Sequence, residues 1–170
     1  MVMPLTTEAV NDPSGSVRVP KFVEEAIAAG VEHTYAGGFE FFVGGGVAVL
    51  DCDDDRRPEL YFAGGGAPAA LYRNRSRDSG PLRFKRLASE TTDVTSVVGA
   101  YPLDIDSDGI EDLVVLRHGE NLLLRGLGQC QFERVNEAWG FDGGDEWTTA
   151  FSATWEAGRA WPTLAFGTYI

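Results

Sequence analysis

One stretch decides the fold of this chain, Asp104-Ile105-Asp106-Ser107-Asp108-Gly109-Ile110-Glu111-Asp112-Leu113. Carboxylates alternate along its first five positions, a glycine follows, and a further carboxylate precedes an apolar run. Side chains at alternate positions of a tight loop can converge on one point. That arrangement suits a hard cation, which takes six to eight oxygen ligands at about 2.3–2.6 Å. The pattern predicts a calcium-binding loop, with a solvated acidic turn as the alternative.

The loop supplies both side-chain and main-chain oxygens. The predicted ligands are the carboxylates of Asp104, Asp106, Asp108 and Asp112 and the carbonyl oxygen of Ile110, with water completing the shell. Gly109 belongs to the pattern because the chain must reverse sharply after the third carboxylate, and glycine adopts positive φ almost freely.

An EF-hand also begins with alternating Asp and a glycine at position six, but it needs a Glu at position twelve and a helix on each side. Position twelve counted from Asp104 is Val115. It lies in the apolar run of residues 113–116, which is short and β-branched and therefore favours a strand. The sequence excludes an EF-hand here.

Composition narrows the class of protein. The chain has 170 residues, of which 44% are hydrophobic, enough for one domain with a core. Lys and Arg total 14 against 26 Asp and Glu, a net charge of -12. Nucleic acid is therefore not an expected partner, because its binding needs a basic surface, whereas divalent cations suit an acidic chain. The sequence contains no run of about 18 apolar residues, so no membrane-spanning helix is predicted.

The two cysteines, Cys52 and Cys130, are too few for a disulfide framework in a chain of this length. Each lies in an apolar or turn context. We expect both to be free, buried thiols rather than partners in a bridge.

A repeat of about 52 residues organises the rest of the chain. The first copy has an apolar run at 45–50, an acidic loop at 51–59 and Leu71-Tyr72-Arg73-Asn74; the second has 98–103, the loop at 104–112 and Leu123-Leu124-Arg125-Gly126. A third, degenerate copy keeps apolar runs at 149–154 and 164–166. Its ligand positions carry Trp155, Ala157, Arg159 and Thr163, so it has lost the metal.

A further strand-like element recurs near Phe22, Phe84 and Phe132. One unit thus contains four short antiparallel strands, the size and strand count of a propeller blade. We predict an all-β fold: a partial β-propeller of about three four-stranded antiparallel blades, the third incomplete, with calcium loops between the first and second strands. The predicted segments are a flexible lead-in (1–21), an outer strand and helical turn of a preceding blade (22–43), a blade with the first acidic loop (44–96), a blade with the second (97–146) and the truncated third blade (147–170).

The repeat resembles the FG-GAP/VCBS repeats of integrin-α-like β-propellers. The residues that carry this resemblance are Gly46-Val47-Ala48 before the first loop, the loop at 104–113 and the Leu71–Asn74 turn. Within that group, the sequences of residues 44–55 and 71–74 resemble the branch related to cartilage acidic protein and the ASPIC/UnbV proteins. The resemblance implies a structural calcium in the loops and ligand-binding loops on a propeller face. It also implies a second site, formed by Asp51, Asp53, Asp55 and Glu59, with Arg57 at the position of Ile110.

The first loop departs from the family pattern at two positions. Arg56 stands where the pattern has glycine, and Glu59 is longer than the usual Asp. Close carboxylates repel one another without a counter-charge. Either a cation supplies that charge, or Arg56 or Arg57 supplies it internally in a metal-free salt bridge.

We expect a binding and assembly scaffold whose partner is a protein or a glycan. A carbohydrate-binding module and an accessory domain of an extracellular enzyme are the alternatives. No enzyme activity is expected of the chain itself, because no nucleophile, base and orienting group stand out. An extracellular or periplasmic location follows from oxygen sites that load at near-millimolar calcium, although residues 1–12 do not form a signal peptide. Three copies are too few to close a ring, which predicts a fragment or a homo-oligomer.

Overall fold

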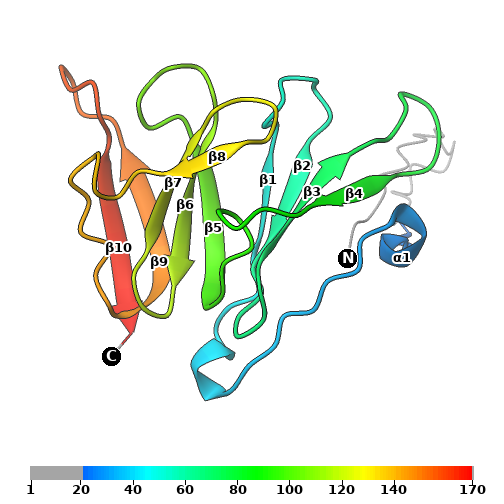
Figure 1. Ribbon diagram of the computed structural model, residues 1–170, viewed down its shortest axis with the longest axis horizontal. Coiled ribbons are helices and arrows are strands. Elements are labelled where there is room, and N and C mark those ends of the chain that lie inside the picture. Colours follow the sequence, from blue (N-terminus) through cyan, green and yellow to red (C-terminus); the bar gives the residue numbers. More distant parts are fainter. Residues whose placement is uncertain (1–20, 170) are drawn as a thin grey trace, which may run out of the picture.

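The computed structural model describes residues 21–169, and these residues form an all-β protein with two short helical elements (Figure 1). The helical elements are α1 (Ala26–Ala29) and the 3-10 helix η1 (Phe39–Phe41). The all-β class predicted from the sequence is confirmed. Most of the predicted lead-in, residues 1–20, lies outside the described residues. No helix within residues 21–169 has the length and apolarity needed to cross a membrane.

The strands form three antiparallel sheets in chain order. Sheet 1 contains β1 (Val47–Leu50), β2 (Glu59–Phe62), β3 (Ala70–Asn74) and β4 (Phe84–Leu87). Sheet 2 contains β5 (Val97–Leu103), β6 (Asp112–Arg117), β7 (Leu122–Gly126) and β8 (Phe132–Arg134). Sheet 3 is the hairpin of β9 (Trp147–Thr154) and β10 (Thr163–Tyr169). Two four-stranded antiparallel sheets are present, as predicted, and residues 147–169 form a two-stranded hairpin.

Each acidic loop joins the first two strands of its sheet. The pairs Leu50↔Glu59 and Leu103↔Asp112 close the two loops in the same register. A strand therefore stands on each side of both loops, an arrangement unlike the flanking helices of an EF-hand.

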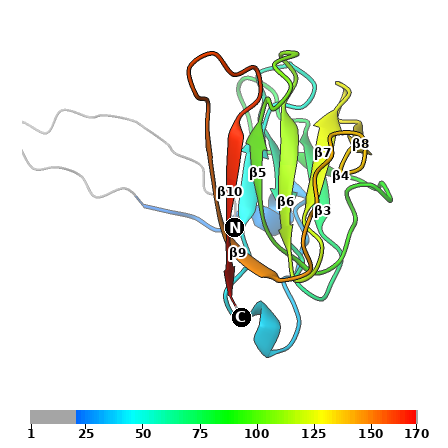
Figure 2. The same ribbon diagram turned by 90° about the vertical axis from the view of Figure 1, so that its left-hand side faces the viewer.

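The three sheets lie side by side, with sheet 2 between the other two (Figures 1 and 2). One core layer fills the space between sheets 1 and 2 and includes Leu50, Tyr61, Leu71, Leu113, Val115 and Leu124. A second layer joins sheets 2 and 3 through Val114, Leu116, Leu123, Phe151 and Phe166. Because both faces of β6 are covered, its apolar residues are consecutive rather than alternating, and Leu113, Val114 and Val115 are fully buried.

The segment before β1 packs against the far face of sheet 1. Helix α1 ends at Gly30, whose φ of 84° is the left-handed conformation typical of a helix C-terminus. Val31 then packs with Leu60 and Tyr72. In residues 22–43, where an outer strand and a helical turn were expected, the structure has α1, η1 and one isolated bridge, Ala36↔Gly65, and no strand. Gly37, at φ 137°, interrupts the extended backbone there.

Candidate metal centre

The second loop folds around the carboxylate of Asp104. Its two oxygens accept hydrogen bonds from the main-chain N–H groups of Asp108 (3.1 Å) and Gly109 (3.0 Å). Oδ1 of Asp108 accepts one from the N–H of Ile110 at 2.9 Å. The Asp108 bond, to the N–H two residues ahead, is an Asx turn, whereas the Asp104 bonds reach four and five residues ahead. They turn the backbone so that oxygens of Asp104, Asp106 and Asp108 lie within 4.8 Å of one another.

Asp112, the fourth predicted carboxylate of this loop, lies outside that group of three. It is fully buried, and its oxygens accept hydrogen bonds from the N–H groups of Ile105 and Gly126, both at 2.8 Å. Burial raises the pKa of Asp112 to about 6. The structure thus shows Asp112 bracing the base of the loop. Ile110 is half-buried at the position predicted to offer a carbonyl oxygen.

The first loop repeats the three hydrogen bonds described above; the bond from the Asp108 N–H to Oδ1 of Asp106 in the second loop (3.2 Å) has no counterpart in the first. The oxygens of Asp51 accept hydrogen bonds from the N–H groups of Asp55 (3.0 Å) and Arg56 (2.9 Å), and Asp55 accepts one from the N–H of Arg57 at 2.9 Å. Arg56 has the positive φ of 63° that Gly109 has at 85° in the second loop. The substitution of arginine for glycine therefore leaves the turn intact, at a backbone strain of about 1 kcal/mol.

Glu59 occupies the place of Asp112. Its Oε2 accepts a hydrogen bond from the N–H of Cys52 at 3.2 Å, and its Oε1 accepts one from the N–H of Asn74 at 3.1 Å. Glu59 is also fully buried, and burial raises its pKa to about 7. Unlike Asp112, it has an oxygen within 4.8 Å of oxygens of Asp51 and Asp53. The extra methylene of glutamate gives it this reach.

Asp53 is the most unusual group of the first loop. Its side chain is fully buried, and neither carboxylate oxygen accepts a hydrogen bond from the described residues. Arg73 forms an ion pair with Oδ2. A buried carboxylate without hydrogen bonds is unfavourable unless a cation compensates it. Oδ1 of Asp53 is therefore free to act as a ligand.

Arginine side chains also reach these loops, and most of them were not foreseen. Arg57, predicted at a ligand position, ion-pairs with Asp55 at 2.5 Å. Arg73 and Arg125, on the third strands of sheets 1 and 2, pair with Asp53 and Asp106. The sequence did show the recurring Leu-x-Arg, but nothing local in that motif indicates which carboxylate each arginine contacts.

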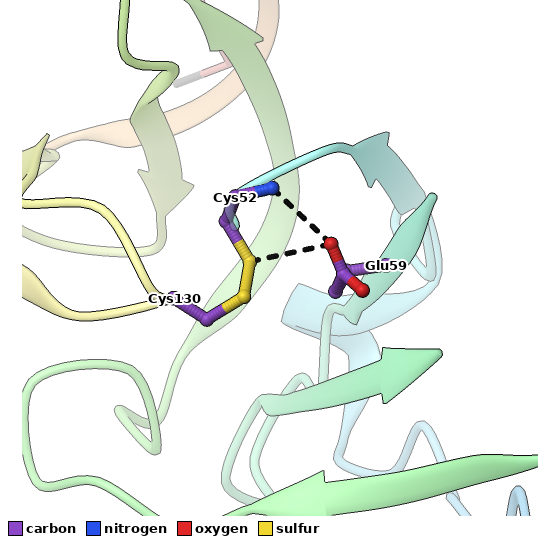
Figure 3. A group of neighbouring side chains, drawn as sticks. All are labelled: Cys52, Glu59 and Cys130. Carbon is purple, nitrogen blue, oxygen red and sulfur yellow. Dashed lines mark hydrogen bonds between the residues drawn. A yellow bond between two sulfur atoms is a disulfide. The ribbon is translucent and has the colours of Figure 1, made fainter. Parts of the chain in front are cut away.

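The free thiols predicted for Cys52 and Cys130 are wrong, because the two residues form a disulfide (Figure 3). Cys52 lies in the first loop and Cys130 in the turn between β7 and β8. The N–H of Cys130 donates to the carbonyl of Cys52 at 3.0 Å, so the turn of sheet 2 packs directly on the loop of sheet 1. Their sequence separation of 78 concealed this proximity. Oxidised sulfurs have no thiolate to offer, so the group of Cys52, Cys130 and Glu59 is not a metal site.

A hydrogen bond joins the two acidic loops directly. The N–H of Asp51 donates to Oε2 of Glu111 at 2.7 Å. Glu111 precedes Asp112 in the second loop, and therefore one loop helps to fix the first ligand position of the other.

No family model matches the chain, and no curated protein matches it either. Each loop brings three carboxylates close enough to share one cation: Asp51, Asp53 and Glu59 in the first loop, and Asp104, Asp106 and Asp108 in the second. Carboxylate oxygens are ligands for hard divalent cations.

Proposed function

We propose that this chain is a calcium-binding β-propeller repeat module of the FG-GAP/VCBS type, acting as a binding and assembly scaffold. In this proposal sheets 1 and 2 are blades, sheet 3 is a degenerate blade, and the metal is structural. The observation that carries the proposal is the buried carboxylate of Asp53. It has an oxygen without a hydrogen bond, and it lies in a loop built like its copy around Asp104.

The oxygen-rich character of the loops supports calcium, and their position supports a structural role. Each loop closes the hairpin of the first two strands, and the disulfide and Glu111 link the first loop to sheet 2. An ion that binds only the folded state stabilises it, by about 2.7 kcal/mol when the ion is at 100 times its dissociation constant. A cation here would stabilise the hairpins and, through these links, the packing of sheets 1 and 2.

The proposal includes an extracellular or periplasmic location. Disulfides persist in oxidising compartments, and loosely tuned calcium sites load where calcium is near millimolar. A protein or glycan partner and a homo-oligomer that completes the ring belong to the same proposal.

Isothermal titration of the decalcified chain with Ca²⁺ tests the metal sites. We expect two bound ions and a higher melting temperature with calcium than with EDTA. Asp53→Asn should lose one site. Asp54→Asn is the matched control, because Asp54 is exposed in the same loop and carries the same charge. A wild-type chain that takes up no Ca²⁺, or equal stoichiometry in the two variants, would refute the proposal.

A carbohydrate-binding module remains the second candidate, favoured by two tryptophans on the connection between β9 and β10. Trp155 and Trp161 are each 49% exposed, and Trp161 packs edge-on against Trp139 at 5.1 Å between ring centroids. Exposed indole faces can stack on sugar rings. Binding on a glycan array that is lost in Trp161→Ala and independent of calcium would favour this function over the scaffold.

A further inference from the structure

Both four-stranded sheets direct an arginine from their third strand to the acidic loop. Arg73 in β3 and Arg125 in β7 occupy the same place in the repeat, one residue before the end of the strand. Arg73 pairs with Asp53, the third-position carboxylate of its loop, and Arg125 places Nε 2.8 Å from Oδ2 of Asp106, the equivalent carboxylate. Two copies of the repeat therefore make the same contact independently.

In each of these carboxylates the arginine contacts one oxygen, Oδ2. Nη2 of Arg125 also donates to Oδ2 of Asp108 at 2.8 Å, so a single guanidinium spans the third and fifth positions of the second loop. In the first loop two arginines divide this work: Arg73 contacts Asp53, and Arg57 contacts Asp55. The first-position carboxylates, Asp51 and Asp104, instead accept main-chain N–H groups.

The guanidinium groups thus engage Oδ2 of these carboxylates and not Oδ1. In the second loop, Oδ1 of Asp106 and Oδ1 of Asp108 accept main-chain N–H groups. In the first loop, Oδ1 of Asp53 is buried and accepts no hydrogen bond from the described residues. Arginine carries its positive charge at all physiological pH values. It offsets carboxylate repulsion when the loop holds no ion, and it repels a cation that enters.

From these contacts we propose that Arg73 and Arg125 are built-in counter-cations that lower the affinity of the two loops for divalent ions. They keep the ion-free loops folded and make the sites exchangeable rather than permanently occupied. This inference rests on the proposed function, since it concerns the affinity of the same sites.

Charge removal measures the effect. At a separation of about 6 Å in a water-like dielectric, a unit positive charge changes the affinity of a site for a divalent ion about tenfold. Titration of decalcified Arg125→Gln with Ca²⁺ should therefore show one site about tenfold tighter and the other unchanged. Without calcium the same variant should melt at a lower temperature than the wild type. Arg73→Gln should show the same behaviour at the other site.

Two further variants are controls. One keeps the local positive charge but changes the shape of the side chain, and the other changes the net charge of the protein away from the loops. Arg125→Lys keeps the charge but loses the planar fork, and it should retain an affinity close to that of the wild type. Arg75→Gln changes the net charge equally, at an exposed arginine that forms no ion pair within the described part of the chain, and it should leave both sites unchanged. Equal tightening in Arg75→Gln, or unchanged or weaker binding in both Arg73→Gln and Arg125→Gln, would overturn the inference while leaving the calcium sites standing. A wild-type chain that binds no Ca²⁺ would instead overturn the proposed function and the inference with it.

Discussion

Removal of the Cys52–Cys130 disulfide should destabilise the folded protein by about 4 to 5 kcal/mol. The bond joins residues separated by 78 positions, and the loop-closure entropy for a ring of that size corresponds to about 4.5 kcal/mol at 25 °C. Both cysteines are buried, at 3% and 8% exposure. Replacement by alanine therefore adds a small cavity penalty of about 1 kcal/mol.

Guanidinium denaturation of the oxidised protein, with and without a phosphine reductant, measures this difference. The double variant Cys52→Ala/Cys130→Ala is the control, because its unfolding free energy should be low under both conditions and indifferent to the reductant. Reduction should also weaken calcium binding at the first loop more than at the second, since Cys52 lies between Asp51 and Asp53.

Two observations would refute this reasoning. One is a count of two free thiols in the denatured, unreduced protein. The other is a change of less than about 1 kcal/mol on reduction, which would mean that the covalent link between sheets 1 and 2 does not restrict the unfolded chain as the entropy argument requires.

Three further predictions concern the loops. Arg56→Gly should stabilise the protein by about 1 kcal/mol, because Arg56 has φ 63°. Gly109→Arg should lower stability by a similar amount, because φ is 85° there and no neighbouring atom would add a clash. Melting temperatures equal to that of the wild type would contradict both predictions. The pKa of Glu59 is raised from 4.5 to about 7, so the folded, metal-free protein binds a proton at Glu59 more tightly than the unfolded chain does. In EDTA, the wild type should therefore lose stability relative to Glu59→Gln as pH rises from about 4.5 through about 7. Parallel stability-versus-pH profiles for the two proteins would contradict this prediction. Gly126→Ala should lower the unfolding free energy by about 2 kcal/mol or more, because the added Cβ would lie 2.4 Å from the carbonyl oxygen of Glu111. Gly128→Ala is the control, since it adds only the backbone strain of a φ of 75°. A smaller loss of stability in Gly126→Ala than in this control would contradict the steric explanation.

Much of the site follows from local sequence. A carboxylate bonds to N–H groups four and five residues ahead in both loops, and this local geometry is encoded by the spacing of Asp51 and Asp55 and of Asp104 and Asp108. The repeat placed both loops between first and second strands. The repeat did not predict the different positions of Asp112 and Glu59. Asp112 bonds to main-chain N–H groups and lies outside the group of three carboxylates, whereas Glu59 has an oxygen within the corresponding group of the first loop.

The side chains that contact the loops from other strands could not be predicted from the sequence. Arg73, Arg125 and Glu111 contact carboxylates or N–H groups that neighbouring strands and sheets bring near. The N-terminal segment shows the same limit, because the packing of Val31 on sheet 1 depends on a surface formed by strands β2 and β3.

The amino-acid sequence alone was sufficient to predict the all-β class, the two four-stranded units and the acidic loops between their strands. It could do so because alternating side chains, turn glycines and Asx-type bonds act over a few residues. The disulfide, the arginine contacts and the hydrogen bond from the Asp51 N–H to Glu111 were revealed by the folded structure alone. Each of these depends on how one sheet or strand packs against another, and that packing is set by the buried layers on both faces of β6 rather than by any local pattern.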